Sequence, residues 1–163
     1  MKQLWAPWRM VYIEDDSKEK GCIFCTKPQS QDLRNGLVLT QTAHTVVMLN
    51  KYPYNNGHLL IAPKRHENNL ACLNPEQYVD LNEVLRRSVQ VVREVLHPTG
   101  VNVGMNLGKC AGAGIEDHLH WHIVPRWEGD TNFMPVIGET RVMPQHLLDS
   151  YDRLQPHFRK CSA

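Results

Sequence analysis

The sequence predicts an α+β fold: an antiparallel sheet of about five strands with one long helix packed on one face. Short apolar runs separated by turn residues recur between residues 36 and 126, which is typical of strands. Apolar residues at helical spacing over about 75–97 interrupt these runs. The 163 residues show no repeat and no linker, so we expect one domain over 1–163, with an N-terminal arm at 1–20 and a C-terminal extension at 128–163.

Four strands are predicted in the first two thirds of the chain. Residues 37–39 and 45–49 are aliphatic or β-branched, and their short separation predicts a hairpin. The turn cluster at 50–57 leads to a third apolar run at 58–63. Residues 101–106 alternate between apolar and polar types, which predicts a fourth strand with one buried face.

The long helix has a clear start signal. Asn74 can be its N-cap, Pro75 suits the first helical position, and Gln77 can close a capping box. Its apolar positions form one face that we expect to be core: Tyr78, Leu81, Leu85, Val89, Val92 and Leu96. A second, short amphipathic helix is predicted over 145–159.

Charge and cysteine content exclude several classes of protein. The net charge of +1 gives no electrostatic reason to expect nucleic acid or an anionic membrane as a partner. No apolar run approaches the roughly 20 residues of a membrane span. Five cysteines without a secretory signal indicate the reducing cytoplasm, where a close cysteine pair binds metal or acts in catalysis more often than it forms a disulfide.

The most informative stretch is 118–127, which predicts the fifth strand. His118, His120 and His122 alternate with apolar residues, so they should lie on one face of that strand. Three interpretations compete: a core strand that tolerates histidine, a catalytic metal site, and covalent nucleotide chemistry with one histidine as the nucleophile.

The segment 108–114 just before the histidines favours the third interpretation. It contains three glycines and two alanines, so backbone N–H groups are free to point at oxyanions. Lys109 adds a positive charge that suits a polyphosphate. Near the other end of the chain, Cys22 and Cys25 form a CxxC pair that can place both sulfurs on one metal ion, but the pair needs two further ligands.

The histidine segment, His118-Leu-His120-Trp-His122-Ile-Val, resembles the motif His-φ-His-φ-His-φ-φ of the histidine triad (HIT) superfamily of nucleotide hydrolases and transferases. The stretch 56–64 resembles the upstream strand that supplies a fourth histidine in that family. The N-terminal Leu-Trp-Ala-Pro-Trp-Arg and the segment Pro-Arg-Trp-Glu-Gly-Asp-Thr-Asn-Phe resemble the bacterial diadenosine tetraphosphate phosphorylases of the superfamily. The resemblance implies a HIT-like fold.

The resemblance implies a role for each matching residue. His120 would attack the α-phosphorus and form a nucleotidyl-histidine, while His122 and His58 would bind phosphate and hold the attacking imidazole. Asn50 falls where the family carries an acidic residue on the ribose hydroxyls. The phosphate oxygens would be bound by Asn106, Gly112 and Gly114. The implied substrates are dinucleoside polyphosphates, with inorganic phosphate or water as the acceptor.

Two alternatives to this function remain open. One is a hydrolase of nucleoside phosphoramidates or other mononucleotides from the same superfamily. Residues 113–117, Ala-Gly-Ile-Glu-Asp, disfavour it, because many HIT hydrolases carry Gly-Gln-Ser/Thr-Val there. The other alternative is a non-catalytic nucleotide-binding module stabilised by zinc.

The resemblance also implies a cofactor and an assembly. In zinc-containing members, the CxxC pair is joined by a histidine after the third strand and by the first histidine of the triad, here Cys22, Cys25, His66 and His118. Two thiolates and two imidazoles close a tetrahedral Zn²⁺ site, which is therefore structural, and the chemical step needs no metal. Superfamily members usually pair, so we expect a homodimer or higher homo-oligomer in which the long helix and the aromatic arm are candidate interfaces.

Overall fold

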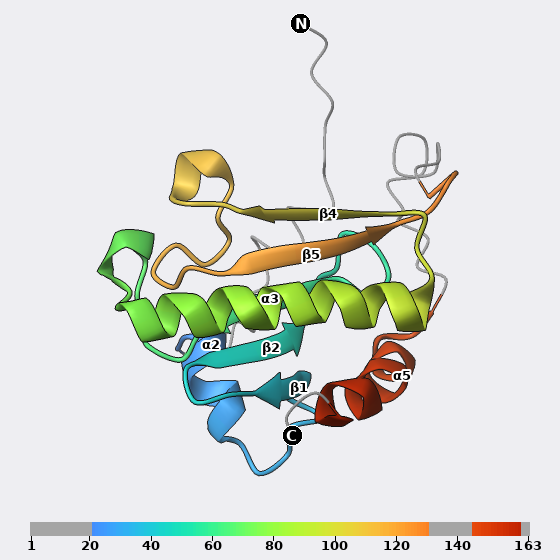
Figure 1. The fold of residues 1–163 in the computed structure, drawn as a ribbon, viewed down its shortest axis with the longest axis horizontal. Helices are drawn as coiled ribbons and strands as arrows, with labels where there is room; N and C mark the ends of the chain where they lie inside the picture. Colours follow the sequence, from blue (N-terminus) through green and yellow to red (C-terminus); the bar gives the residue numbers. More distant parts are fainter. Residues whose placement is uncertain (1–20, 131–144, 161–163) are drawn as a thin grey trace, which may run out of the picture.

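A computed structural model describes residues 21–130 and 145–160 of the chain (Figure 1). Within them, five strands form one antiparallel sheet in the order β1-β2-β3-β5-β4. The strands are β1 (Val38–Gln41), β2 (Thr45–Leu49), β3 (Leu59–Pro63), β4 (Gly100–Met105) and β5 (Trp121–Arg126). The predicted α+β class and strand number are confirmed. The arm expected at 1–20 lies outside the described residues, as do 131–144 and 161–163 of the C-terminal extension.

The described helices are the long α3 (Pro75–Leu96), the C-terminal α5 (Leu147–Lys160) and the single-turn α2 (Ile23–Thr26). Three short 3-10 helices lie in the connections: η1 (Lys27–Gln29), η2 (Leu70–Cys72) and η3 (Lys109–Ala111). The predicted capping box is present, because the Asn74 side chain accepts from the Gln77 N–H at 2.8 Å and the Gln77 side chain accepts from the Asn74 N–H at 3.2 Å. None of these helices is long and apolar enough to cross a membrane.

The sheet has a different core on each face. In Figure 1, α3 runs across the front of the sheet, and α5 lies beside β1 below it. Val47 and Leu49 of β2 face α3 and α5, whereas Val46 and Met48 face the opposite side. Alternation along a strand therefore divides the apolar residues between a large core under α3 and a small core that Phe24 of α2 closes.

The histidine strand begins later than the sequence predicts. β5 starts at Trp121, so His122 lies in the strand while His118 and His120 precede it. Before the strand, the Leu119 N–H donates at 2.8 Å to the backbone oxygen of Glu67, a residue far away in the sequence, instead of to a neighbouring strand. The alternation survives, because Leu119 and Ile123 are buried in the core under α3.

Candidate functional site

The three histidines of the predicted catalytic site, His58, His120 and His122, meet on the face of the sheet opposite α3. His58 directly precedes β3, and β3 pairs with β5 in a register that sets Leu60 opposite His122. The rings of His58 and His122 are 5.1 Å apart between centroids, and those of His120 and His122 are 4.9 Å apart. His58 and His120 are buried, with exposed fractions of 0% and 3%.

Hydrogen bonds fix which nitrogen of His58 and of His122 carries a proton. The backbone N–H of Tyr54 donates to Nδ1 of His58 at 3.0 Å, so this nitrogen carries a lone pair and Nε2 carries the proton. Nε2 of His58 lies 2.9 Å from Nδ1 of His122 and donates to it. The neutral His122 ring therefore carries its own proton on Nε2, where it can donate to a phosphate oxygen.

The protonation of His120 follows from the same reasoning. Its Nδ1 lies 2.8 Å from the backbone oxygen of His118, and a carbonyl oxygen can only accept. Nδ1 therefore carries the proton, and the neutral ring keeps its lone pair on Nε2. Burial lowers the pKa of His120, which favours the neutral ring. Burial and the neighbouring His120 lower the pKa of His122 to about 4.

The turn at 50–57 supports these rings. Tyr54 stacks on His122, with ring centroids 5.7 Å apart and an interplanar angle of 13°, and contacts His58 at 4.6 Å. The Asn50 amide nitrogen lies 3.3 Å from Nδ1 of His58, and its oxygen accepts from the Tyr52 N–H at 2.9 Å. The structure thus places Asn50, the predicted ribose ligand, directly beside His58.

The predicted phosphate-binding segment is a glycine-rich turn. Gly108 and Gly112 have φ of 83° and 89°, a region that side chains disfavour. The Asn106 amide reaches the Gly112 oxygen at 3.5 Å, so two of the predicted phosphate ligands are adjacent. Gly114, the third, follows in the same connection between β4 and β5. These turn residues lie at the surface or are only half-buried.

The four predicted metal ligands also come together. One ligand atom each from Cys22, Cys25, His66 and His118 lies within 4.8 Å of the others. Nδ1 of His118 is 3.2 Å from the Cys22 sulfur, 3.7 Å from the Cys25 sulfur and 3.3 Å from Nδ1 of His66. A tetrahedral zinc ion, with Zn–S of about 2.3 Å and Zn–N of about 2.0–2.1 Å, gives S···N edges of about 3.5 Å and N···N edges of about 3.3 Å. The donor set therefore fits such an ion.

The protonation of His118 fits the same site. Its Nε2 lies 2.7 Å from the Pro63 oxygen and donates to it, so the neutral ring presents its Nδ1 lone pair to the other three ligands. This buried hydrogen bond fixes the orientation of the ring. The His118 ring thus faces the other three candidate metal ligands, while its backbone oxygen accepts from His120. This separates its position from those of the other two triad histidines.

Two residues that sequence reasoning did not single out also belong to the site. Phe24, between the two cysteines, contacts the rings of both His118 and His120. Tyr54 supplies its N–H and its ring to His58. The CxxC spacing points to the cysteines and not to the two residues between them, and Tyr54 lies in a segment that its composition marks as a turn.

Comparisons with known proteins agree with this geometry. A family model described as the HIT domain matches residues 34–129. A protein of Mycobacterium tuberculosis named AP-4-A phosphorylase is 37% identical over 158 residues, which cover 92% of this chain and 80% of that protein. A Schizosaccharomyces pombe protein named asymmetrical bis(5'-nucleosyl)-tetraphosphatase is 32% identical over 93 residues, which cover 57% of this chain and 50% of that protein. The solved structure of a Zn-bound histidine triad family protein from Mycobacterium smegmatis has a TM-score of 0.64 and 25% identity, covering 86% of this chain and 95% of that one.

Proposed function

The chain belongs to the HIT family, and on that premise we propose that it is an enzyme that cleaves dinucleoside polyphosphates such as diadenosine tetraphosphate. The reaction proceeds through a covalent nucleotidyl-histidine on His120. The relative named AP-4-A phosphorylase, which matches most of this chain, supports both the substrate class and inorganic phosphate as the acceptor.

One observation carries the proposal: the hydrogen bond of 2.8 Å from Nδ1 of His120 to the His118 oxygen. It fixes the tautomer in which Nε2 holds a lone pair, and a neutral nucleophile meets no charge repulsion from an anionic phosphate chain. The same bond stabilises the positive charge that the ring gains when Nε2 attacks phosphorus.

In the first step, Nε2 of His120 forms a bond to the α-phosphorus, and the bond from that phosphorus to the bridging oxygen breaks. The leaving group departs as a nucleoside triphosphate anion, which for diadenosine tetraphosphate is ATP. The Nε2 proton of His122 stabilises charge on the phosphoryl oxygens. His58 donates to Nδ1 of His122 and so keeps the His122 proton on Nε2.

In the second step, the acceptor attacks the same phosphorus and the P–N bond breaks, which returns neutral His120. Inorganic phosphate gives ADP and water gives AMP. A phosphate oxygen is already anionic and needs no general base, whereas water must lose a proton. The product, ADP or AMP, identifies which acceptor has reacted.

We assign Zn²⁺ to the cluster of Cys22, Cys25, His66 and His118. Its four protein ligands leave no open position, so the ion acts as a structural cross-link between α2, the segment after β3 and the triad. The zinc named in the M. smegmatis structure supports the assignment. Because both thiols must stay reduced, we place the protein in the cytoplasm.

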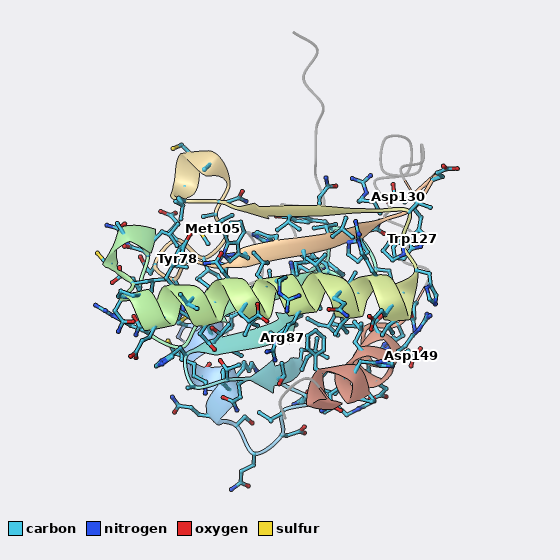
Figure 2. The ribbon with its side chains drawn as sticks, in the orientation of Figure 1. Tyr78, Arg87, Met105, Trp127, Asp130 and Asp149 are labelled. Atoms are coloured by element: carbon cyan, nitrogen blue, oxygen red, sulfur yellow. The ribbon has the colours of Figure 1, made fainter. Side chains whose placement is uncertain are left out.

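We also propose that two copies associate. β4 is an edge of the sheet, and Val103 on its α3-facing side is 45% exposed. Figure 2 shows Tyr78 of α3 and Met105 of β4 at the same end of the molecule. Exposed apolar side chains on these two elements suit a second copy of the chain. Light scattering on the purified protein tests this, and a monomeric mass would contradict it.

The function is tested by incubating the protein with diadenosine tetraphosphate, with and without inorganic phosphate, and identifying the products. ADP together with ATP, formed only when phosphate is present, is expected. AMP with ATP in the presence of phosphate would instead assign water as the acceptor. A non-catalytic module would bind the nucleotide but form neither product nor an acid-labile adduct on His120.

A further inference from the structure

Phe24 joins the metal cluster to the attacking histidine. We propose that it is a positioning residue, through which the loaded metal site holds the His120 ring in place for attack. This inference rests on the proposed function, since it assumes that His120 is the nucleophile. It extends the role of the metal site from stability to the rate of the chemical step.

Phe24 contacts both a proposed metal ligand and the proposed nucleophile. Its ring centroid is 5.1 Å from that of His118, a metal ligand, and 5.0 Å from that of His120. Phe24 is only 1% exposed, so its ring is enclosed on all sides and moves little unless its neighbours move. It lies in α2 between Cys22 and Cys25, and its backbone is therefore bounded by two ligand residues.

A second contact on His120 comes from the same cluster. The His118 backbone oxygen accepts the Nδ1 proton of His120, while the His118 ring faces the other ligands and donates to Pro63. The ring of the nucleophile is thus packed by Phe24 and hydrogen-bonded to His118. Both residues are fixed by the site that binds the metal.

His120 needs this support because the sheet holds it weakly. The pairing of β5 with β3 begins at Trp121, one residue after His120. Helix α2 has four residues, far fewer than the roughly 12–15 that an isolated helix needs. A metal ion bound by Cys22 and Cys25 therefore stabilises the conformation of α2. Phe24, which lies in α2, in turn restricts the movement of the His120 ring.

A purely structural role for Phe24 makes a different prediction. Phe24 also fills the small core that contains Val46, Met48 and Leu60, so its removal destabilises the protein in either case. Val46 is fully buried in that core and lies on β2. Val46→Ala therefore removes buried volume from the same core and leaves the ring contacts to His120 intact, which makes it the matched control.

The test compares Phe24→Leu, Phe24→Ala and Val46→Ala in the metal-loaded protein. Mixing excess enzyme with diadenosine tetraphosphate gives the rate of adduct formation on His120, and steady-state assays give kcat and KM. Because a misplacement of about 1 Å can slow a reaction by about 100-fold, we expect Phe24→Ala to slow adduct formation by about 10- to 100-fold while KM changes by less than about threefold. Phe24→Leu keeps most of the volume and is expected to slow it several-fold.

Val46→Ala is expected to form the adduct within about twofold of the wild-type rate, although it also unfolds more easily. Equal slowing in Val46→Ala and the Phe24 variants would overturn the proposal, as would a wild-type rate in Phe24→Leu. Phe24→Leu decides the matter should Phe24→Ala fail to fold. Metal content measured on each variant separates loss of the ring from loss of the ion.

Chelation tests the link to the metal. Removing the ion should slow adduct formation in the wild-type protein, and by a smaller factor in Phe24→Leu, because the two changes act through one contact. Equal factors in both proteins would show that the metal does not act through Phe24. A loaded wild-type protein that forms no adduct at all would overturn the proposed function itself, a result distinct from either of these.

Discussion

His58 donates its Nε2 proton to Nδ1 of His122 across 2.9 Å, and the Tyr54 N–H prevents the reverse arrangement. This pair of hydrogen bonds leaves the single ring N–H proton of His122 on Nε2, where it can donate to a phosphate oxygen. In His58→Phe, Nδ1 of His122 loses its donor, so the ring can take the other tautomer and present a lone pair to the phosphate. We expect kcat to fall by about 10- to 100-fold, somewhat less than the about 100- to 1,000-fold typical of losing such a donor outright. His44→Gln, remote from this pair in sequence, should retain wild-type kcat.

Replacing the nucleophile has a larger effect. His120→Ala removes Nε2, so no adduct can form, and we expect turnover to be abolished while the protein still folds. The measurement is product formation from diadenosine tetraphosphate by a variant whose circular dichroism spectrum and metal content match the wild type. Substantial residual turnover in that sample would contradict the assignment of His120.

The proposed zinc site predicts both the metal content and the stability of the protein. Protein purified without added metal should contain one zinc per chain, and Cys22→Ser should lose it. We expect the free energy of unfolding to fall by about 4–5 kcal/mol, because loss of a structural metal is among the few single changes that cost so much. Cys72 is exposed and lies outside the cluster, so Cys72→Ser is the matched control and should keep both metal and stability. Wild-type protein without zinc would refute the assignment.

The sequence predicts those features that depend on neighbouring residues. Asn74 and Gln77 meet within one turn, so the capping box and the start of α3 follow from sequence alone. The late start of β5 does not, because it depends on a hydrogen bond between Leu119 and Glu67, which are far apart in the chain. Only a folded chain brings that pair together.

The candidate site, too, is only partly predictable from local sequence patterns. Alternation places the triad on one face, and the CxxC spacing indicates half of a metal site. The other two ligands, His66 and His118, were implied by the family resemblance and not by the residues themselves. No local pattern indicates Phe24, because its contacts are with the rings of His118 and His120, which are far from it in the sequence.

Gly57 allows the backbone conformation that directly precedes His58. Its φ is +72°, and a Cβ there would collide with Cδ1 of Leu96 at the end of α3. Gly57→Ala should therefore destabilise the protein by about 2–3 kcal/mol, through backbone strain and overpacking together, and should lower kcat by shifting His58. Gly129 has a similar φ of +74° with nothing within 4 Å of an added Cβ. Gly129→Ala thus measures the strain alone, and equal losses of stability in the two variants would contradict a role for Leu96.

The half-buried His122 makes the stability of the protein depend on pH. Its pKa is lowered to about 4 in the folded protein by burial and by His120, against 6.5 for the ordinary side chain. The rings that face it are those of Tyr54, His58 and His120. Between these two pH values the unfolded chain binds a proton that the folded chain does not, so stability is fully present above pH 6.5 and falls as the pH drops towards 4.

Replacing His122 should remove this contribution. Urea unfolding of His122→Gln between pH 4 and pH 7 is expected to give a shallower dependence than the wild type. His58 still donates, now to the glutamine oxygen, so the variant keeps a partner for that buried ring. His44→Gln, which removes a histidine outside the site, should keep the wild-type slope. Identical slopes in His122→Gln and the wild type would mean that His122 titrates normally in the folded protein and is not held neutral by its surroundings.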